Sequence, residues 1–486
     1  MAIVYGHVSQ PGSIAKIARI KRPNRCRTYV GLRWDAPPDA PKDSMADSTA
    51  RRACRVWIFN HYATPPDRPG GTRHYWIGRA IVARHGEVTI FATGFGHASG
   101  RNDRVGGRAL VRNEIFDGVR FVWLRSFPYR GNTWRRIVNM ASYAVMVTLA
   151  QVGRPRPDVV VGSSVHPLAA LAGWFVARLR RARFVYEVRD LWPQTMIDIG
   201  VMGEHSPTAR ILYAIEAFLA RHAESIVTVL PGMTAYLASR GLPTAHVHYL
   251  PNGADLSAAG SSERDARGTA AGMDPLPPVL EDLAERRARG EVVFAWAGAH
   301  GLVNGLDVAI RAMALASIDG APPMSLLLVG DGPEKPALKR LASELGATNV
   351  LFIDPIRKDR IPELLANVDV GVLHATATPV HRYGVSFNKL FDYMAAGLPI
   401  AFACDTFADP VAAAGAGLTI RPDDPQALAA GFLTLASASE AERRRMGAAG
   451  RALVERDHDL AKIGSAFADL LGCDLKEGSE PRPVGS

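Results

Sequence analysis

The fold is decided by one stretch near the C-terminal end of the chain, Tyr383-Gly384-Val385-Ser386-Phe387-Asn388-Lys389-Leu390-Phe391-Asp392-Tyr393-Met394-Ala395-Ala396-Gly397-Leu398-Pro399-Ile400. Its apolar residues recur at helical spacing up to Gly397, which stands where a helix would end in a left-handed residue. Pro399 then prevents the helix from continuing into the apolar run that follows. The stretch therefore predicts a loop, a helix capped at its N-terminus by Asn388, and a strand.

The N-terminus of this predicted helix is suited to a phosphate group. Its unpaired backbone N–H groups and the helix dipole favour negative charge, and Lys389 adds a cation. Asp392 lies one turn beyond Asn388, where its carboxylate can accept hydrogen bonds from two neighbouring sugar hydroxyls. A phosphate beside a ribose predicts a nucleotide ligand, and we expect Ser386 in the preceding loop to contact it as well.

The stretch resembles the donor segment of family 4 retaining glycosyltransferases, especially the subgroup that transfers amino sugars, often N-acetylated deoxy sugars, in bacterial surface-polysaccharide assembly. That family carries two glutamates here with seven residues between them. Asp392 holds the second place, whereas the first falls on Gly384 in a longer loop. The resemblance implies an α/β protein of the GT-B fold, in which two doubly wound Rossmann-like domains face each other across a cleft and a C-terminal helix crosses back.

Length and composition indicate a globular chain with two domains. The chain has 486 residues, of which 48% are apolar and 21% charged, enough for two substantial cores. Residues 1–53 hold ten Lys or Arg against four Asp with little periodicity, and we expect a disordered basic extension. A nucleic-acid-binding arm is the weaker alternative, because no binding module follows. We therefore expect no nucleic-acid partner.

The cysteines and the hydropathy indicate the cytoplasm. The four cysteines, Cys26, Cys54, Cys404 and Cys473, are scattered without a C-x-x-C spacing, which argues against a disulfide framework and against a zinc site. No run approaches the eighteen or so apolar residues that span a bilayer, and the first residues lack the layout of a signal peptide. We expect a cytoplasmic protein, at most bound to the inner face of the plasma membrane.

Strand-like and helical runs alternate along the chain. Strands are expected at 55–60, 87–92, 119–124, 157–162, 183–188, 224–230 and 246–250, and then at 292–297, 324–329, 350–353, 369–373 and 399–403. This alternation predicts two parallel sheets covered by helices, with ligands bound at the carboxyl ends of the strands. The expected divisions are an extension (1–53), an acceptor domain (54–255), a linker (256–290), a nucleotide-sugar domain (291–456), a crossover helix (457–473) and a tail (474–486).

A glycine-rich turn follows the first strand of the second domain. Gly298 and Gly301 would let the backbone approach a diphosphate, and a helix beginning near Asn304 would add its dipole, although a plain turn is the alternative. The resemblance implies an Arg and a Lys in this turn, where the chain has His300 and Asn304, so charge neutralisation should fall to Lys389. It also implies that backbone near Ile356 reads the edge of the base.

The acceptor side is expected in the first domain. Arg189-Asp190-Leu191-Trp192-Pro193 follows a buried strand and resembles the Asp-Leu-Trp-Pro motif of the subgroup. We assign Asp190 to the acceptor as a hydroxyl-binding group or base, and the alternative is a helix N-cap with a packed Trp192. The same side should include Gly70, Gly71, His166 and Arg189.

Two further features have structural alternatives. Asp457-His458-Asp459 has the spacing of a metal-binding D-x-D motif, but Asp before an apolar helix is the expected cap, so we predict no metal and no cofactor. Residues 129–151 predict a very apolar helix with Arg135 and Arg136 near its start. Core packing is the default explanation, and contact with an anionic membrane that holds a lipid-linked acceptor is the alternative.

Together these features predict a retaining glycosyltransferase of the hexosyl or N-acetylhexosaminyl type. Its catalytic residues would be Asp190, Lys389 and Asp392. Its donor would be a nucleotide-sugar, UDP-linked as the resemblance implies, and its acceptor a lipid-linked or free saccharide. Two alternatives stay open: a sugar-nucleotide epimerase of the same fold, and a non-catalytic binding partner, which would explain the absent glutamate. A dinucleotide oxidoreductase is disfavoured because no G-x-G-x-x-G follows the first strand.

Overall fold

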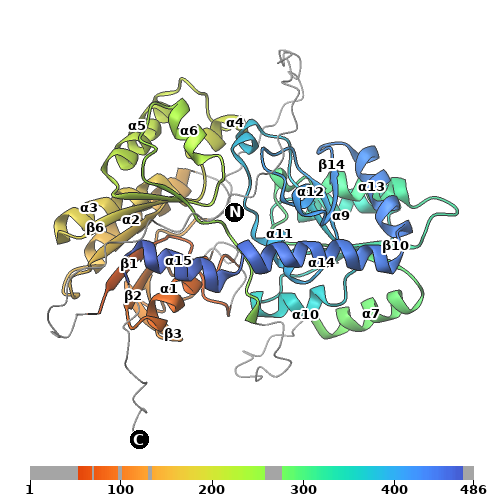
Figure 1. The fold of residues 1–486 in the computed structure, drawn as a ribbon, viewed down its shortest axis with the longest axis horizontal. Coiled ribbons are helices and arrows are strands. Elements are labelled where there is room, and N and C mark those ends of the chain that lie inside the picture. The colour runs from red at the N-terminus through yellow and green to blue at the C-terminus, as the bar shows by residue number, and fades with distance from the viewer. Residues whose placement is uncertain (1–52, 68–69, 97–100, 130–133, 258–275, 474–486) are drawn as a thin grey trace, which may run out of the picture.

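The computed structural model describes residues 53–67, 70–96, 101–129, 134–257 and 276–473. The predicted basic extension, apart from its last residue, and the predicted tail after Cys473 lie outside these ranges, as does part of the linker. Figure 1 shows two α/β domains side by side, with β1 in one of them and the last helix, α15, returning to that domain.

The N-terminal domain contains an eight-stranded sheet in the order β3-β4-β2-β1-β5-β6-β7-β8. Its strands are β1 (Arg55–Phe59), β2 (Glu87–Thr93), β3 (Val111–Phe116), β4 (Val119–Leu124), β5 (Val159–Ser163), β6 (Arg183–Val188), β7 (Ser225–Thr228) and β8 (Val247–Tyr249). All pairs are parallel except β3–β4. The interior strands are nearly continuous apolar runs because helices cover both faces of the sheet.

The edge strand β3 was not predicted. It joins β4 through a tight turn at Asp117 and Gly118, whose φ angles are 46° and 82°. Asp-Gly is a typical sequence for such a hairpin turn. The strand itself is half exposed and carries polar residues, so it lacks the apolar run that marks the interior strands.

Helices cover the N-terminal sheet on both faces. One face packs against α1 (Arg73–Ala83) and the returning α15 (Leu460–Leu470), and the other against α2 (Trp134–Ala150), α3 (Pro167–Arg180) and α5 (Pro207–His222). Shorter helices, α4 (Gln194–Asp198) and α6 (Met233–Ser239), follow β6 and β7. Two separate apolar layers therefore hold this domain together.

The C-terminal domain contains an entirely parallel six-stranded sheet in the order β11-β10-β9-β12-β13-β14. Its strands are β9 (Val292–Ala297), β10 (Met324–Val329), β11 (Val350–Ile353), β12 (Val370–His374), β13 (Ile400–Ala403) and β14 (Gly417–Ile420). Its helices are α7 (Leu276–Ala288), α8 (Leu306–Ala316), α9 (Lys335–Glu344), α10 (Ile361–Leu365), α11 (Asn388–Ala395), α12 (Pro410–Ala414), α13 (Pro425–Ser437) and α14 (Glu440–Asp457). The two parallel sheets confirm the predicted fold class.

The chain passes between the domains twice, and the two passages touch. Ala254 and His458 form a backbone hydrogen bond of 2.9 Å, and the Leu460 N–H donates to the Ala254 carbonyl at 3.0 Å. Asp459 caps α15 by accepting from the Ala461 N–H, as predicted for this apparent D-x-D motif. In Figure 1 α14 and α15 run as one line from the second domain to the first, which confirms the predicted crossover.

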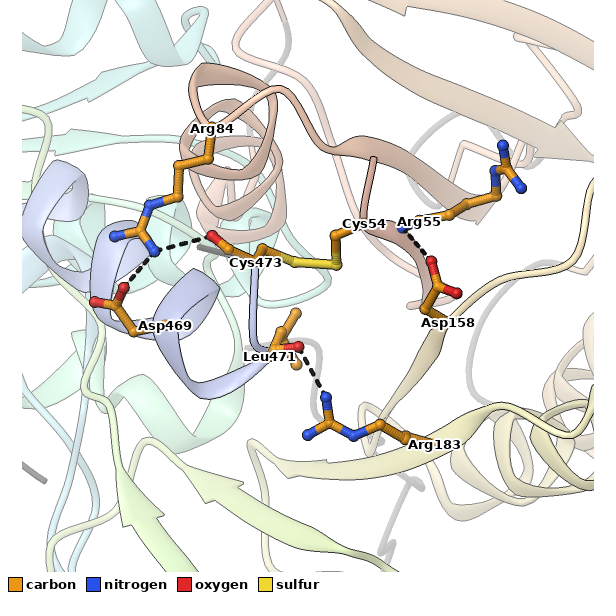
Figure 2. The surroundings of a disulfide bond; sticks show 8 residues. All are labelled: Cys54, Arg55, Arg84, Asp158, Arg183, Asp469, Leu471 and Cys473. Atoms are coloured by element: carbon orange, nitrogen blue, oxygen red, sulfur yellow. Dashed lines mark hydrogen bonds and ion pairs between the residues drawn. A yellow bond between two sulfur atoms is a disulfide. The ribbon is translucent and has the colours of Figure 1, made fainter. Parts of the chain in front are cut away.

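A disulfide joins the two ends of the described fold, and here the sequence prediction was wrong. Figure 2 shows Cys54, which precedes β1, bonded to Cys473, which lies three residues beyond the end of α15. The Cα atoms of the two cysteines are 5.6 Å apart. Arg84 donates to the Cys473 carbonyl at 3.2 Å, and Arg183 donates to the Leu471 carbonyl at 3.0 Å. Because 419 positions separate the two cysteines, spacing along the sequence could not pair them.

Candidate active site

Lys389 and the glycine-rich turn after β9 lie against each other. The ammonium nitrogen of Lys389 lies 3.3 Å from the centroid of the Trp296 ring, a cation–π contact. A Cβ atom at Gly298 would come within 3.1 Å of the same ammonium group, so glycine leaves room for the lysine side chain. The structure thus brings together the two backbone junctions that the sequence predicts to hold a diphosphate.

The electrostatic state of Lys389 suits an anionic ligand. Burial lowers the pKa of Lys389 to about 7, and the neighbouring Asp392 opposes that shift. The indole nitrogen of Trp296 is also buried and has no hydrogen-bond partner in the part of the chain that the structure describes. An anion bound beside the lysine would favour its charged form, so ligand binding and protonation are coupled here.

Asn388 is the first residue of α11, which corrects the predicted N-cap. Phe387 occupies the N-cap position, and no side chain caps the helix. The N–H groups of the first turn therefore keep their capacity to bind a ligand. Ser386 is turned toward the domain hinge, where its hydroxyl accepts from the Asn252 N–H at 3.0 Å and its carbonyl accepts from the Asn252 side chain at 2.7 Å.

Asp392 forms an ion pair with Lys358, a residue that the sequence did not single out. Lys358 begins a short 3-10 turn, η3 (Lys358–Arg360), two residues after the buried Ile356. The pair holds the carboxylate of Asp392 in one place, one turn after the start of α11. It also connects that carboxylate to the segment expected to read the base.

His300 occupies a buried position in the turn after β9. Neither of its ring nitrogens has a hydrogen-bond partner within the described ranges, and burial, followed by the nearby Lys335, lowers its pKa to about 4. Its backbone N–H donates to the Asp331 carbonyl at 2.9 Å. A neutral imidazole without a protein partner can exchange hydrogen bonds with a ligand.

The helix expected near Asn304 begins later than predicted. A 3-10 turn, η2 (Leu302–Asn304), follows Gly301, and α8 starts only at Leu306, after Gly305 in a left-handed conformation. The Asn304 side chain donates to the Ala299 carbonyl at 2.7 Å. Asn304 therefore stabilises the glycine-rich turn from within.

Gly71 and Arg189 of the first domain meet Asn388 of the second. A Cβ atom at Gly71 would lie 3.7 Å from the Asn388 amide nitrogen and 3.9 Å from a guanidinium nitrogen of Arg189. Gly70 precedes this contact with a φ of 140°. The predicted acceptor and donor residues thus converge across the junction of the domains.

Asp190 does not cap a helix, so that alternative was wrong. The helix that follows, α4, begins at Gln194 with Pro193 in the N-cap position. Burial raises the pKa of Asp190. A partly buried carboxyl group after β6 and beside Arg189 can bind an acceptor hydroxyl.

His166 has a structural role at the start of α3. It is buried, and its Nδ1 accepts from the Ala169 N–H at 3.3 Å, so its Nε2 carries the proton toward His61 Nδ1 at 2.8 Å. Burial, followed by Arg136, lowers the pKa of His166 to about 3. The neutral ring serves as an N-cap at the carboxyl end of β5.

A buried charged cluster lies behind the acceptor residues and was missed from the sequence. Arg73 and His74, the first residues of α1, contact the Glu187 carboxylate at 2.9 Å and 2.6 Å, and Arg73 also donates to the Leu250 carbonyl at 2.8 Å. Burial would raise the pKa of Glu187, but His74 and Arg73 hold it well below its usual range. The cluster fixes the start of α1, and with it Gly71, against the strand that leads to Arg189.

The chain is similar to known proteins in both halves. Residues 70–253 match the model of a "Glycosyl transferase 4-like domain", and residues 291–438 match that of "Glycosyl transferases group 1". WcaI of Escherichia coli K12, named as a colanic acid biosynthesis glycosyl transferase, is 23% identical over 336 residues, which are 65% of this chain and 76% of that protein.

Solved structures share the whole fold. Sucrose-phosphate synthase from Thermosynechococcus elongatus superposes with a TM-score of 0.65 at 18% identity, over 86% of this chain and 98% of that chain. Alr3699/HepE from Anabaena, in complex with UDP and glucose, superposes with a TM-score of 0.59 at 16% identity, over 86% of this chain and 99% of that chain.

Proposed function

We propose that the chain, whose two halves match glycosyltransferase family models, is a family 4-type glycosyltransferase that transfers a sugar from a UDP-linked donor to an acceptor hydroxyl with retention of configuration. The observation that carries this proposal is that two successive residues of α11 contact different walls: Lys389 lies against Gly298, and Asn388 lies against Gly71 and Arg189. We expect the diphosphate of the donor to bind beside Lys389 and Gly298, and the acceptor to bind beside Gly71 and Arg189. The HepE structure with UDP and glucose supports a uridine nucleotide as donor.

The proposed mechanism depends on positioning and on charge. The bond between the sugar C1 and the diphosphate oxygen breaks while a bond from C1 to the acceptor oxygen forms on the same face. The acceptor proton passes to the departing phosphate oxygen, so no enzymatic nucleophile is needed. Lys389 and the N–H groups of α11 stabilise the developing diphosphate charge, and Asp190 orients the acceptor hydroxyl.

The transferred sugar, the acceptor and the location of the reaction extend this proposal. The resemblance to the amino-sugar subgroup favours a hexose or N-acetylhexosamine as the transferred sugar, and WcaI's name favours surface-polysaccharide assembly. The acceptor is then a lipid-linked or free saccharide. We place the reaction in the cytoplasm, at the inner face of the plasma membrane, on the basis of these resemblances, because the Cys54–Cys473 disulfide removes the support that the cysteine spacing gave.

A panel of labelled UDP-sugars with a lipid-linked saccharide tests the proposal. Release of UDP together with a glycosylated product is expected, and Lys389→Ala should lower turnover about a hundredfold or more. An isomerised donor without transfer would instead indicate an epimerase. Binding without any reaction would indicate a non-catalytic partner, an alternative that the glycine in place of the family's first glutamate keeps open.

A further inference from the structure

Helix α2 exposes a row of apolar side chains. Ile137, Val145 and Leu149 are 64%, 58% and 59% exposed, and their spacing of eight and four residues places them on one side of the helix. The opposite side, which includes Tyr143 and Val147, is buried against the sheet. Core packing, the default expectation for this helix, therefore explains only half of its apolar surface.

The neighbouring helix α3 continues this exposed surface. Phe175 and Leu179 are exposed, and α2 and α3 pack against each other on the same face of the sheet. We call the exposed side chains Ile137, Val145, Leu149, Phe175 and Leu179 the apolar face. No helix within the described ranges is long and apolar enough to cross a bilayer.

The segment that contains α2 and α3 is rich in arginine. Residues 118–186 contain eleven arginines and a single acidic residue, Asp158, so this segment alone carries a net charge of +10, as much as the whole chain. Neither α2 nor α3 contains an acidic residue. Arg135, Arg178 and Arg181 are exposed beside the apolar face.

We propose that the apolar face and its arginines dock the enzyme on a bilayer with anionic headgroups, and that the acceptor is a saccharide carried by a lipid of that bilayer. The inference rests on the proposed function, and it selects between the two acceptor classes left open there. Apolar side chains that enter the headgroup region, flanked by cations, are the features by which proteins lie on anionic membranes.

The position of the helices connects this surface to the acceptor site. Each helix follows a parallel strand and returns antiparallel to it, so α2 and α3 begin at the cleft edge of the sheet. Trp134, 68% exposed, stands at the first position of α2, and His166 caps α3 beside His61 at the end of β1. A bilayer along the apolar face therefore covers the outside of the acceptor domain, and Ile137 and Trp134 bring its edge toward the cleft.

A second copy of the chain is a poorer occupant of this surface. A twofold contact would place the apolar face of one copy on that of the other. The arginines of both copies would then lie together without a carboxylate from either helix, which is unfavourable. Anionic phospholipid headgroups supply the missing negative charge.

Vesicle sedimentation tests the proposal with the full-length protein. We expect strong binding to vesicles of phosphatidylcholine with phosphatidylglycerol, weak binding to phosphatidylcholine alone, and weaker binding at high salt. Ile137→Ser/Val145→Ser/Leu149→Ser should reduce partitioning at least about tenfold, and Arg135→Gln/Arg178→Gln should reduce it about fivefold per residue. Leu315→Ser/Ile318→Ser, which removes exposed apolar side chains from the other domain, should have no effect.

Three results would overturn the docking surface. One is wild-type binding by the triple serine variant, and another is equal affinity for neutral and anionic vesicles. The third is a dimer in sedimentation velocity that the triple serine variant dissociates. Binding of UDP-glucose, measured in parallel without vesicles, separates failure of the membrane proposal from failure of the proposed function. If only the docking surface is wrong, UDP-glucose still binds. If the donor site is wrong, UDP-glucose does not bind.

Discussion

The pKa of Lys389 predicts a specific pH dependence of donor binding. In the free protein burial lowers this pKa to about 7. A diphosphate beside the ammonium would return the pKa toward its ordinary value of about 10.4. Binding then takes up a proton, and affinity must fall as the pH rises above 7, because the neutral amine has to be protonated first.

The size of the effect follows from this shift. Between pH 6.5 and 8.5 the dissociation constant for UDP-glucose should rise about 25-fold, with a limiting slope of tenfold per pH unit. The diphosphate of UDP-glucose does not titrate in this range, and the pKa of His300, at about 4, lies below it. Isothermal titration calorimetry in buffers of different ionisation enthalpy should show an uptake approaching one proton at pH 8.

Two variants identify the titrating group. Lys389→Arg, which stays protonated at every pH used, should flatten the profile. Glu216 is the matched control, because burial raises its pKa to about 7 as well. Its carboxyl group accepts a hydrogen bond from Tyr236 on α6 and is not one of the donor-site residues, so Glu216→Gln should leave the pH profile unchanged. A wild-type affinity that is constant from pH 6.5 to 8.5, or an equal slope in Lys389→Arg, would refute the reasoning.

Three further outcomes are expected. Gly298→Ala, whose new Cβ would press on Lys389 at a φ of 154°, should lower kcat/KM about tenfold or more while circular dichroism stays native. Cys54→Ser should lower the free energy of unfolding by about 2–5 kcal/mol in urea titrations, reductant should do the same to the wild type, and Cys404→Ser should not mimic either. Lys358→Met, which leaves Asp392 without its ion-pair partner, should lower kcat/KM about tenfold. An unchanged kcat/KM would show that Asp392 does not contribute to the donor site.

Local patterns were sufficient to predict most of the fold. The strands at 119–124, 183–188, 292–297, 324–329 and 350–353 have the predicted bounds, because buried parallel strands are apolar on both faces. The edge strand β3 lacks that signature and was missed. The Cys54–Cys473 disulfide depends on a contact between the ends of the fold, which no local pattern encodes.

The candidate site was predictable only in part, for the same reason. Glycine-rich turns and a helix start can be recognised locally, and they led to Gly298 and Lys389. The partners that fix them come from distant elements, such as Lys358 at Asp392 and Asn252 at Ser386. Sequence reasoning therefore identifies the residues that would face a ligand more readily than those that hold them in place.

The glycine in place of the family's first glutamate gives a last prediction. Gly384 has a φ of 93°, and a Cβ atom there would lie 2.4 Å from the Pro231 side chain of the first domain. The preceding carbonyl of Tyr383 accepts from the Gly232 N–H at 2.8 Å, so this loop joins the two domains. Gly384→Glu should therefore lower kcat/KM about tenfold or more, and Gly384→Ala should do nearly the same, because either Cβ separates the domains. A gain of activity in Gly384→Glu alone would show that the position serves the donor sugar instead.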